Sequence, residues 1–148
     1  MPVLVTEQSP DKFGHIMPEI KKELPLNNCE TISKTTFSMI NEQTKEFLNR
    51  YPHRKTAVLF GAETHVCIQQ TTLDLLSLGY TVFLITDGIS SVRRLDRTTA
   101  FRRLEAEGAL LTTSESAIFE LIRNADHPEF KKLLPIIKIE RFTTIAKL

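Results

Sequence analysis

The sequence predicts an α/β fold in which helices cover both faces of a parallel, Rossmann-like sheet, giving a three-layer α/β/α sandwich. Short runs of β-branched and apolar residues recur along the chain, as expected for buried parallel strands. Segments of helical length separate these runs, and strands that alternate with helices form right-handed βαβ crossovers. We therefore expect a single domain over residues 1–148.

Each element follows from its local pattern. The expected strands cover residues 2–6, 30–33, 56–61, 81–86 and 109–112. The clearest helix covers residues 65–78, because Ile68, Thr72 and Leu75 repeat with helical spacing and Gly79 follows as a helix end. Further helices are expected around Phe47, over residues 91–107, and around Ile118 with Ser114 or Ser116 as N-cap; residues 7–28 should form a loop with one short helix.

Composition limits the function classes. A chain of 148 residues with 41% apolar residues can bury a core, which excludes a disordered protein. A net charge of +1 gives no overall field for nucleic acid or an anionic membrane, so we expect a small-molecule partner. Two cysteines without a signal-peptide core indicate an intracellular protein with free thiols. The sequence gives no reason to assign a metal or another cofactor.

Cys67 is the candidate nucleophile. It follows a predicted strand and lies in the first turn of the next helix. A helix N-terminus favours a thiolate and offers backbone N–H groups to a developing oxyanion. The alternative at this point is that Cys67 is a small core residue, since free cysteines are often buried.

Lys34 is the candidate cation beside this thiol. It ends the second predicted strand, and the carboxyl ends of parallel strands share one edge of a sheet. An ammonium there would favour the thiolate form of Cys67. The alternative is a solvated lysine at a strand end.

Several motifs jointly resemble the isochorismatase-like superfamily, and in particular the animal isochorismatase domain-containing proteins. The nucleophile loop Gly61 to Cys67 is similar, and Lys34 lies in a similar Lys-Thr-x-Phe-Ser motif. The order and spacing of the remaining motifs agree with that family at residues 4–8, 71–76, 86–91 and 112–115. The resemblance covers nearly the whole chain.

The resemblance implies a hydrolase that attacks a small amide or carbonyl substrate through a cysteine, helped by a lysine and an aspartate. Cys67 and Lys34 would be two members of this catalytic triad. The resemblance also implies a cis peptide bond at Ala62-Glu63 and an oxyanion hole formed by the backbone N–H groups of Glu63 and Cys67. The family's sheet has the strand order 3-2-1-4-5-6.

One departure from the family affects activity. In the family, the aspartate ends a first strand, and this chain begins at the second strand, so we expect that central strand to be missing. Glu7, Glu63 and Asp87 lie near strand ends, but we expect none of them to replace the aspartate. The hydrolase should be impaired; the alternative is a non-catalytic truncated isoform or incomplete gene model that acts through protein contacts. Unpaired strand edges favour a homo-oligomer.

A basic segment gives the one indication of a nucleic-acid partner. It contains Arg93, Arg94, Arg97, Arg102 and Arg103. Asp96, Glu105 and Glu107 are interleaved with these arginines, and no aromatic stacking platform lies nearby, so we expect a solvated, ion-paired helix face. The alternative is a ribonuclease or an RNA-binding protein.

The C-terminal tripeptide Ala146-Lys147-Leu148 is similar to a peroxisomal targeting signal, so the protein is expected in peroxisomes, or otherwise in the cytoplasm. We predict that a reporter carrying this C-terminus enters peroxisomes, as seen by fluorescence microscopy. Removing the three residues should leave the reporter in the cytosol. Diffuse fluorescence from the intact fusion would show that the tripeptide is not an address.

Overall fold

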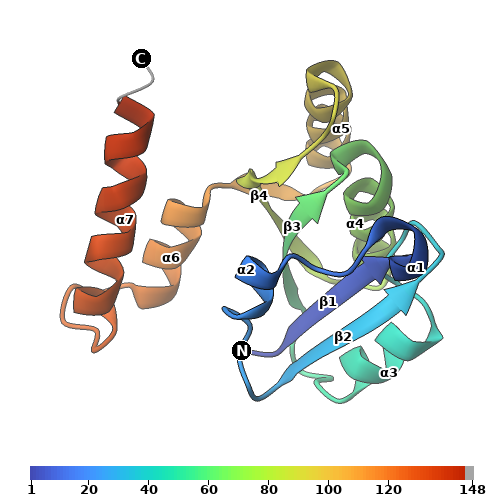
Figure 1. The fold of residues 1–148 in the computed structure, drawn as a ribbon, viewed down its shortest axis with the longest axis horizontal. Helices are drawn as coiled ribbons and strands as arrows, with labels where there is room; N and C mark the ends of the chain where they lie inside the picture. The colour runs from blue at the N-terminus through green and yellow to red at the C-terminus, as the bar shows by residue number, and fades with distance from the viewer. Residues whose placement is uncertain (146–148) are drawn as a thin grey trace.

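The computed structural model describes residues 1–145, with side chains up to residue 137. Five strands form two parallel sheets (Figure 1). One sheet pairs β1 (Val3–Gln8) with β2 (Cys29–Lys34), and the other has the order β3 (Thr56–Ala62), β4 (Thr81–Ser90), β5 (Leu110–Thr112). The predicted α/β class with parallel strands is confirmed. The sheet is divided between β1 and β3, where the sequence predicts unpaired strand edges.

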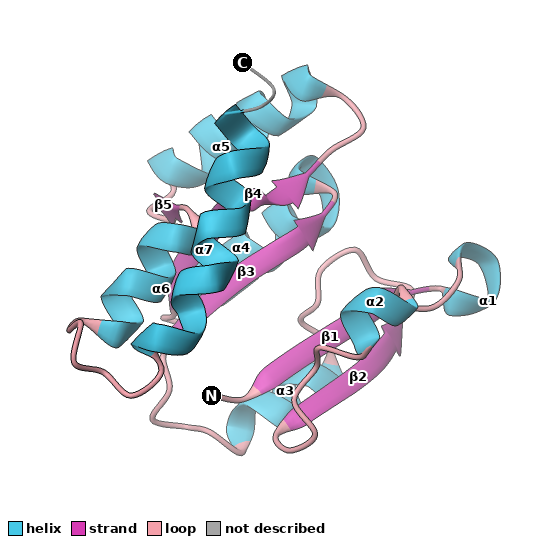
Figure 2. Cartoon of the chain, turned by 60° about the vertical axis from the view of Figure 1, so that its left-hand side comes forward, coloured by secondary structure: helices cyan, strands magenta, loops and turns pink. Residues whose placement is uncertain are grey.

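Helices follow most of the strands. They are α1 (Pro10–Phe13), α2 (Pro18–Lys21), α3 (Glu42–Asn49), the π-helical turn η1 (Thr64–Ile68), α4 (Gln69–Ser77), α5 (Arg94–Ala106), α6 (Ser114–Ile122) and α7 (Phe130–Ile145). Helices α4 and α5 contact one another, while α6 and α7 lie on the other side of β3 and β4 (Figure 2). None of the helices over residues 1–145 is long and apolar enough to cross a membrane.

Local sequence explains where the helices begin and end. Asn41 and Thr44 form a reciprocal capping box at the start of α3. Thr113 caps α6 by accepting a hydrogen bond from the Ser116 N–H, so the N-cap is neither Ser114 nor Ser116, as expected from the sequence, but the residue before Ser114. Gly79 has a φ of 77° and follows α4, as its position in the sequence predicts.

Two segments differ from expectation. The segment between β1 and β2 holds two short helices, α1 and α2, rather than one, and each begins with a proline. Helix α7 was not expected, because Pro135 lies inside it and proline usually interrupts a helix. The targeting tripeptide at 146–148 lies outside the described residues.

The core lies between the β3–β4–β5 sheet and the helices α4 and α5. Val82 and Leu84 from β4 and Leu104 from α5 are fully buried. They pack in one cluster with Leu59, Ile68, Leu75, Tyr80, Ile89, Phe101 and Ala109. This cluster fixes β3 and the turn that follows it, because Leu59 and Ile68 bracket the nucleophile loop.

The inner edges of the two sheets are open. In the described part of the chain, β1 pairs with β2 alone and β3 pairs with β4 alone. The face of β3 is also uncovered, since Val58 is 38% exposed and Phe60 is 66% exposed. A central strand of a parallel sheet is normally paired on both sides and covered on both faces. The unpaired edges expected from the sequence are therefore present between β1 and β3.

The two sheets are joined at their carboxyl ends by side chains. The Ser38 hydroxyl, in the loop after β2, donates to the Asp74 carboxylate on α4 at 2.5 Å. The Met39 N–H donates to the Thr71 hydroxyl of α4 at 2.9 Å. Loop 35–41 therefore holds the β1–β2 sheet against the helix that follows β3.

We predict that amide hydrogen exchange will distinguish the strands. Amides of β4 should exchange slowly, because β4 lies between two partners, whereas the amides of β1 and β3 that point toward the open edges should exchange orders of magnitude faster. Exchange measured residue by residue by NMR tests this, with the fully unfolded chain as the reference. Uniform protection along both β1 and β3 would show that the gap is closed or filled.

Candidate active site

The nucleophile loop is anchored to the end of β4. The peptide bond Ala62-Glu63 is cis, at the position that the resemblance implies. Next along the chain, the buried Thr64 donates its hydroxyl to the Ser90 carbonyl at 2.9 Å and its backbone N–H to the Ser91 hydroxyl oxygen at 3.1 Å. Cys67 lies on the η1 turn that follows, half-buried. The expected helix therefore begins as a π-helical turn.

Lys34 is buried at the end of β2, with 7% of its surface exposed. Its ammonium Nζ donates to three oxygens: Gln8 Oε1 at 2.6 Å, the Thr36 carbonyl at 2.8 Å and the Phe37 carbonyl at 3.0 Å. The same Nζ lies 3.9 Å from Cys67 Sγ. The structure thus brings the two expected side chains together across the divided sheet.

Two opposing effects act on the charge of Lys34. Burial lowers the pKa of the Lys34 ammonium below its usual value, while the nearby Cys67 opposes this shift. Hydrogen bonds to the charged form favour that form. The three oxygens therefore supply what water would otherwise supply to this buried cation.

Sequence reasoning missed Gln8 as part of this site. Gln8 is the last residue of β1, and the parallel register of the two strands places it beside Lys34. Its Nε2 donates to the Thr35 carbonyl at 2.8 Å, while its Oε1 accepts from Lys34. Gln8 belongs to the motif at residues 4–8, and its place at a strand end was the available signal.

The expected oxyanion donors lie on the same turn as the nucleophile. Glu63 precedes η1, and its carbonyl accepts the N–H groups of Val66 and Ile68, both at 3.2 Å. Its side chain turns away, because Glu63 Oε2 accepts the Val92 N–H at 2.9 Å. The backbone of Glu63 and Cys67 therefore lies at a helix start, while the Glu63 carboxylate is held beside the end of β4.

The other two rim carboxylates are also engaged in structural contacts. Glu7 is 8% exposed, and the hydrogen bonds from the Ile16 N–H and the His15 ring hold the pKa of its carboxyl below the usual value. Burial alone would raise the pKa of Asp87, but the hydrogen bonds from the Ser114 side chain and backbone outweigh it and lower that pKa. Asp87 thus fixes the start of α6.

His65 faces the end of β4 and helix α5. Its Nδ1 lies 3.2 Å from the Ser91 hydroxyl and 3.8 Å from Glu63 Oε2, and its Nε2 lies 3.9 Å from Asp96. Within residues 1–137, none of these contacts of His65 involves Cys67. His65 therefore connects the nucleophile loop to Ser91, after β4, and to Asp96 of α5.

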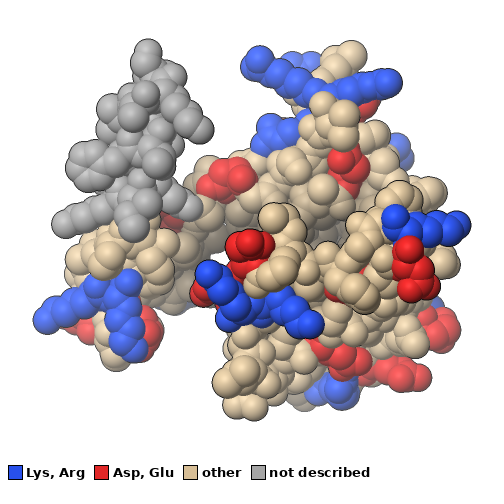
Figure 3. Space-filling model, in the orientation of Figure 1, with Lys and Arg blue, Asp and Glu red and all other residues tan. Residues whose placement is uncertain are grey.

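The arginines of α5 are solvated, as expected, but not ion-paired. Arg93, Arg94, Arg102 and Arg103 are exposed, and basic atoms gather over α5 in Figure 3. Arg97 instead donates to the Ile89 carbonyl at 2.9 Å and to the Thr86 carbonyl. Among residues 1–137, no ion pair joins an α5 arginine to Asp96, Glu105 or Glu107. For Arg97, backbone carbonyls of β4 are the hydrogen-bond partners in place of these acids.

The described side chains contain no group of three or more His, Cys, Asp and Glu residues arranged to hold a metal ion.

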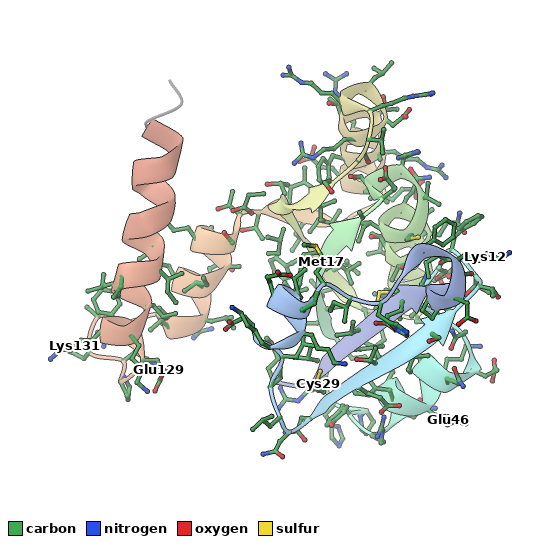
Figure 4. All side chains as sticks on the ribbon, viewed as in Figure 1. Lys12, Met17, Cys29, Glu46, Glu129 and Lys131 are labelled. Atoms are coloured by element: carbon green, nitrogen blue, oxygen red, sulfur yellow. The ribbon has the colours of Figure 1, made fainter. Side chains whose placement is uncertain are left out.

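Cys29, the second thiol, is the first residue of β2 rather than part of a loop before it. Figure 4 shows it at the end of the β1–β2 sheet opposite to Lys34's end of the strand. The two cysteines therefore lie at opposite ends of the parallel strands.

Known proteins match both the sequence and this geometry. Residues 1–116 match the isochorismatase domain family. Isochorismatase family protein 1B of Dictyostelium discoideum is 40% identical over 148 residues, covering 99% of this chain and 72% of that protein. Isochorismatase domain-containing protein 1 of Danio rerio is 40% identical over 140 residues, covering 94% of this chain but 48% of that protein, so this chain spans about half of its length.

A solved structure agrees in fold. The structure of MAR1 ribonuclease from Caenorhabditis elegans has a TM-score of 0.86 and 41% sequence identity, covering 93% of this chain and 69% of that chain. The family match extends over residues 1–116, from β1 through the first turn of α6, and includes Lys34, the nucleophile loop and Cys67. This chain therefore belongs to the isochorismatase domain family.

Proposed function

We propose that this chain is an isochorismatase-like hydrolase domain in which Cys67 attacks a small amide or carbonyl substrate. The observation that carries the proposal is the 3.9 Å contact between Lys34 Nζ, at the end of β2, and Cys67 Sγ, on the η1 turn that follows β3. A buried cation beside a thiol at the start of a helix favours the thiolate, which is the nucleophilic form. No cofactor is required for this chemistry.

The reaction proceeds through a thioester. Cys67 Sγ forms a bond to the substrate carbonyl carbon, and the carbonyl oxygen takes the negative charge, stabilised by the backbone N–H groups of Glu63 and Cys67. When the carbonyl re-forms, the bond to the leaving group breaks and the leaving amine takes a proton from solvent water. A water molecule then attacks the thioester carbon and gives up a proton to solvent, the C–S bond breaks, and the thiolate is regenerated as the carboxylic acid product leaves. Lys34 supplies positive charge throughout.

The proton transfers limit this chain. Among the described residues, no carboxylate hydrogen-bonds Lys34 or Cys67; Glu7, Glu63 and Asp87 are bound elsewhere. The family's aspartate has no counterpart in these contacts. A positioned acid or base typically contributes a factor of about 10² to 10⁴ in rate. The 148-residue chain should therefore be a weak hydrolase, and a role in protein contacts is the alternative.

Self-association is part of the proposal. The open edges of β1 and β3 carry unpaired backbone groups, and Phe60 lies exposed on β3. Unpaired edges favour pairing with another chain. We therefore expect homo-oligomers.

A second candidate function is RNA cleavage. The solved C. elegans structure at 41% identity is of a protein called a ribonuclease. Four exposed arginines, Arg93 at the N-cap of α5 and Arg94, Arg102 and Arg103 within it, could contact phosphates. Incubation with a labelled single-stranded RNA tests this candidate, because an RNA-cleaving protein should shorten the RNA. Cleavage that depends on Cys67 should be lost in Cys67→Ser. RNA binding without cleavage should be lost when the exposed arginines are replaced.

We predict that the 148-residue chain hydrolyses small primary amides at least about 10²-fold more slowly than a version extended by the first strand and helix of a relative, because the extension supplies the proton-transfer group. Ammonia release measures the rate. Cys67→Ser should abolish activity in the extended chain, with Cys29→Ser as the matched control, and light scattering of both samples reports their assembly. Equal rates for the short and extended chains would contradict the proposed limit.

We also predict that Cys67 is the more reactive thiol. Iodoacetamide at neutral pH should label Cys67 several-fold faster than Cys29, because Lys34 stabilises the Cys67 thiolate whereas Cys29 has no such cation among its described contacts. Peptide mass spectrometry at a series of times gives both rates. The unfolded chain in urea should show equal labelling. Faster labelling of Cys29 in the folded chain would exclude Cys67 as an activated nucleophile.

A further inference from the structure

The three oxygen partners of Lys34 use all of the N–H donors of its ammonium group. A lysine ammonium has three N–H groups. Gln8 Oε1, the Thr36 carbonyl and the Phe37 carbonyl lie within 3.0 Å of Nζ, while Cys67 Sγ lies at 3.9 Å. The ammonium therefore acts on the sulfur mainly through its charge and has no N–H group left for a short bond to it.

Gln8 differs from the other two partners. The Thr36 and Phe37 carbonyls belong to the loop that follows Lys34 and come with the backbone, whereas Gln8 reaches Lys34 by its side chain from the neighbouring strand. Its bond to Nζ is also the shortest of the three, at 2.6 Å. Gln8 is the partner that a single substitution can remove.

The orientation of the Gln8 carboxamide is fixed by a second contact. Its Nε2 donates to the Thr35 carbonyl at 2.8 Å, so its Oε1 must face the ammonium. A reversed amide would set two donors against each other at Lys34 and two acceptors against each other at Thr35. Two neighbouring residues therefore bind the Gln8 carboxamide: the Lys34 ammonium donates to its oxygen, and the Thr35 carbonyl accepts from its nitrogen and fixes its orientation.

We propose that Gln8 is a positioning residue for the reaction, because its oriented carboxamide holds Lys34 in the charged state and at the distance from which its charge acts on Cys67. This proposal rests on the proposed function for its catalytic meaning. Gln8 does not touch the substrate in it. Its effect passes entirely through the ammonium of Lys34.

The direct test is the titration of Lys34 in the full chain with ¹³C-labelled lysine, followed by NMR at the Cε carbon. The Lys34 signal is assigned by its loss in Lys34→Met. Gln8→Leu should shift the Lys34 titration to lower pH, because a neutral acceptor of the ammonium is lost. Gln8→Glu should shift it to higher pH, because a carboxylate stabilises the ammonium more strongly. Gln43→Leu, on the exposed face of α3, should leave it unchanged.

A merely structural role of Gln8 would not give opposite shifts for leucine and glutamate. Gln8→Asn guards against a folding defect in Gln8→Leu, since asparagine keeps the amide but is too short to reach both partners, and it should shift the titration in the same direction as leucine. Lys34 titrating at one pH in all variants, or moving the same way in Gln8→Leu and Gln8→Glu, would overturn the proposal.

A second readout separates this proposal from the proposed function. Alkylation of Cys67 by iodoacetamide at neutral pH should be about tenfold slower in Gln8→Leu, the size expected from losing one hydrogen bond to a charged group. If Cys67→Ser retains amide hydrolysis, the proposed function fails while the Lys34 titration still decides the role of Gln8. If Cys67→Ser is inactive but the titration of Lys34 is the same in all Gln8 variants, this inference fails and the proposed function stands.

Discussion

The buried ammonium of Lys34 is the constraint on which the site depends. A buried charge is tolerated only where hydrogen-bond partners replace its lost water. Here three partners come from two elements: the Gln8 side chain on β1, and the carbonyls of Thr36 and Phe37 in the loop after β2. Satisfying this one charge therefore fixes the register of β1 against β2 and the path of the loop that follows.

The loop after β2 also connects Lys34 to the helix that follows Cys67. After Phe37, the Ser38 hydroxyl and the Met39 N–H bind Asp74 and Thr71 on α4. Helix α4 continues directly from the turn that holds Cys67. The β1–β2 sheet and the nucleophile are thus aligned at the carboxyl ends of the strands, although β1 and β3 do not pair along their length. The site occupies the region where the divided sheet is still joined.

The sequence predicted the parts of this arrangement that local pattern determines. The strands were predictable because their β-branched runs are local, and the meeting of Lys34 with Cys67 followed from parallel strands ending at one edge. Gln8 was not predictable in this way, because its role depends on the residue that the β1–β2 register places opposite it. The bond from Ser38 to Asp74 joins residues 36 positions apart and has no local signal. The ion pairs expected on α5 do not form among residues 1–137, because Arg97 donates to backbone carbonyls of β4 and the side chains of Arg93, Arg94, Arg102 and Arg103 are exposed to solvent.

The contacts of the rim carboxylates determine whether any of them is free to transfer protons at Cys67. Each candidate acid at the rim already accepts hydrogen bonds from a backbone N–H: Glu7 from Ile16, Glu63 from Val92 and Asp87 from Ser114. For Glu7 and Asp87, such bonds hold the pKa of the carboxyl below its usual value and make the carboxylate a weaker base. Moving any of them to Cys67 would also release the segment that it holds. In the proposed reaction, Cys67 would be the nucleophile and Lys34 the fixed positive charge, while the protons would pass to solvent water or to a group from outside the described residues.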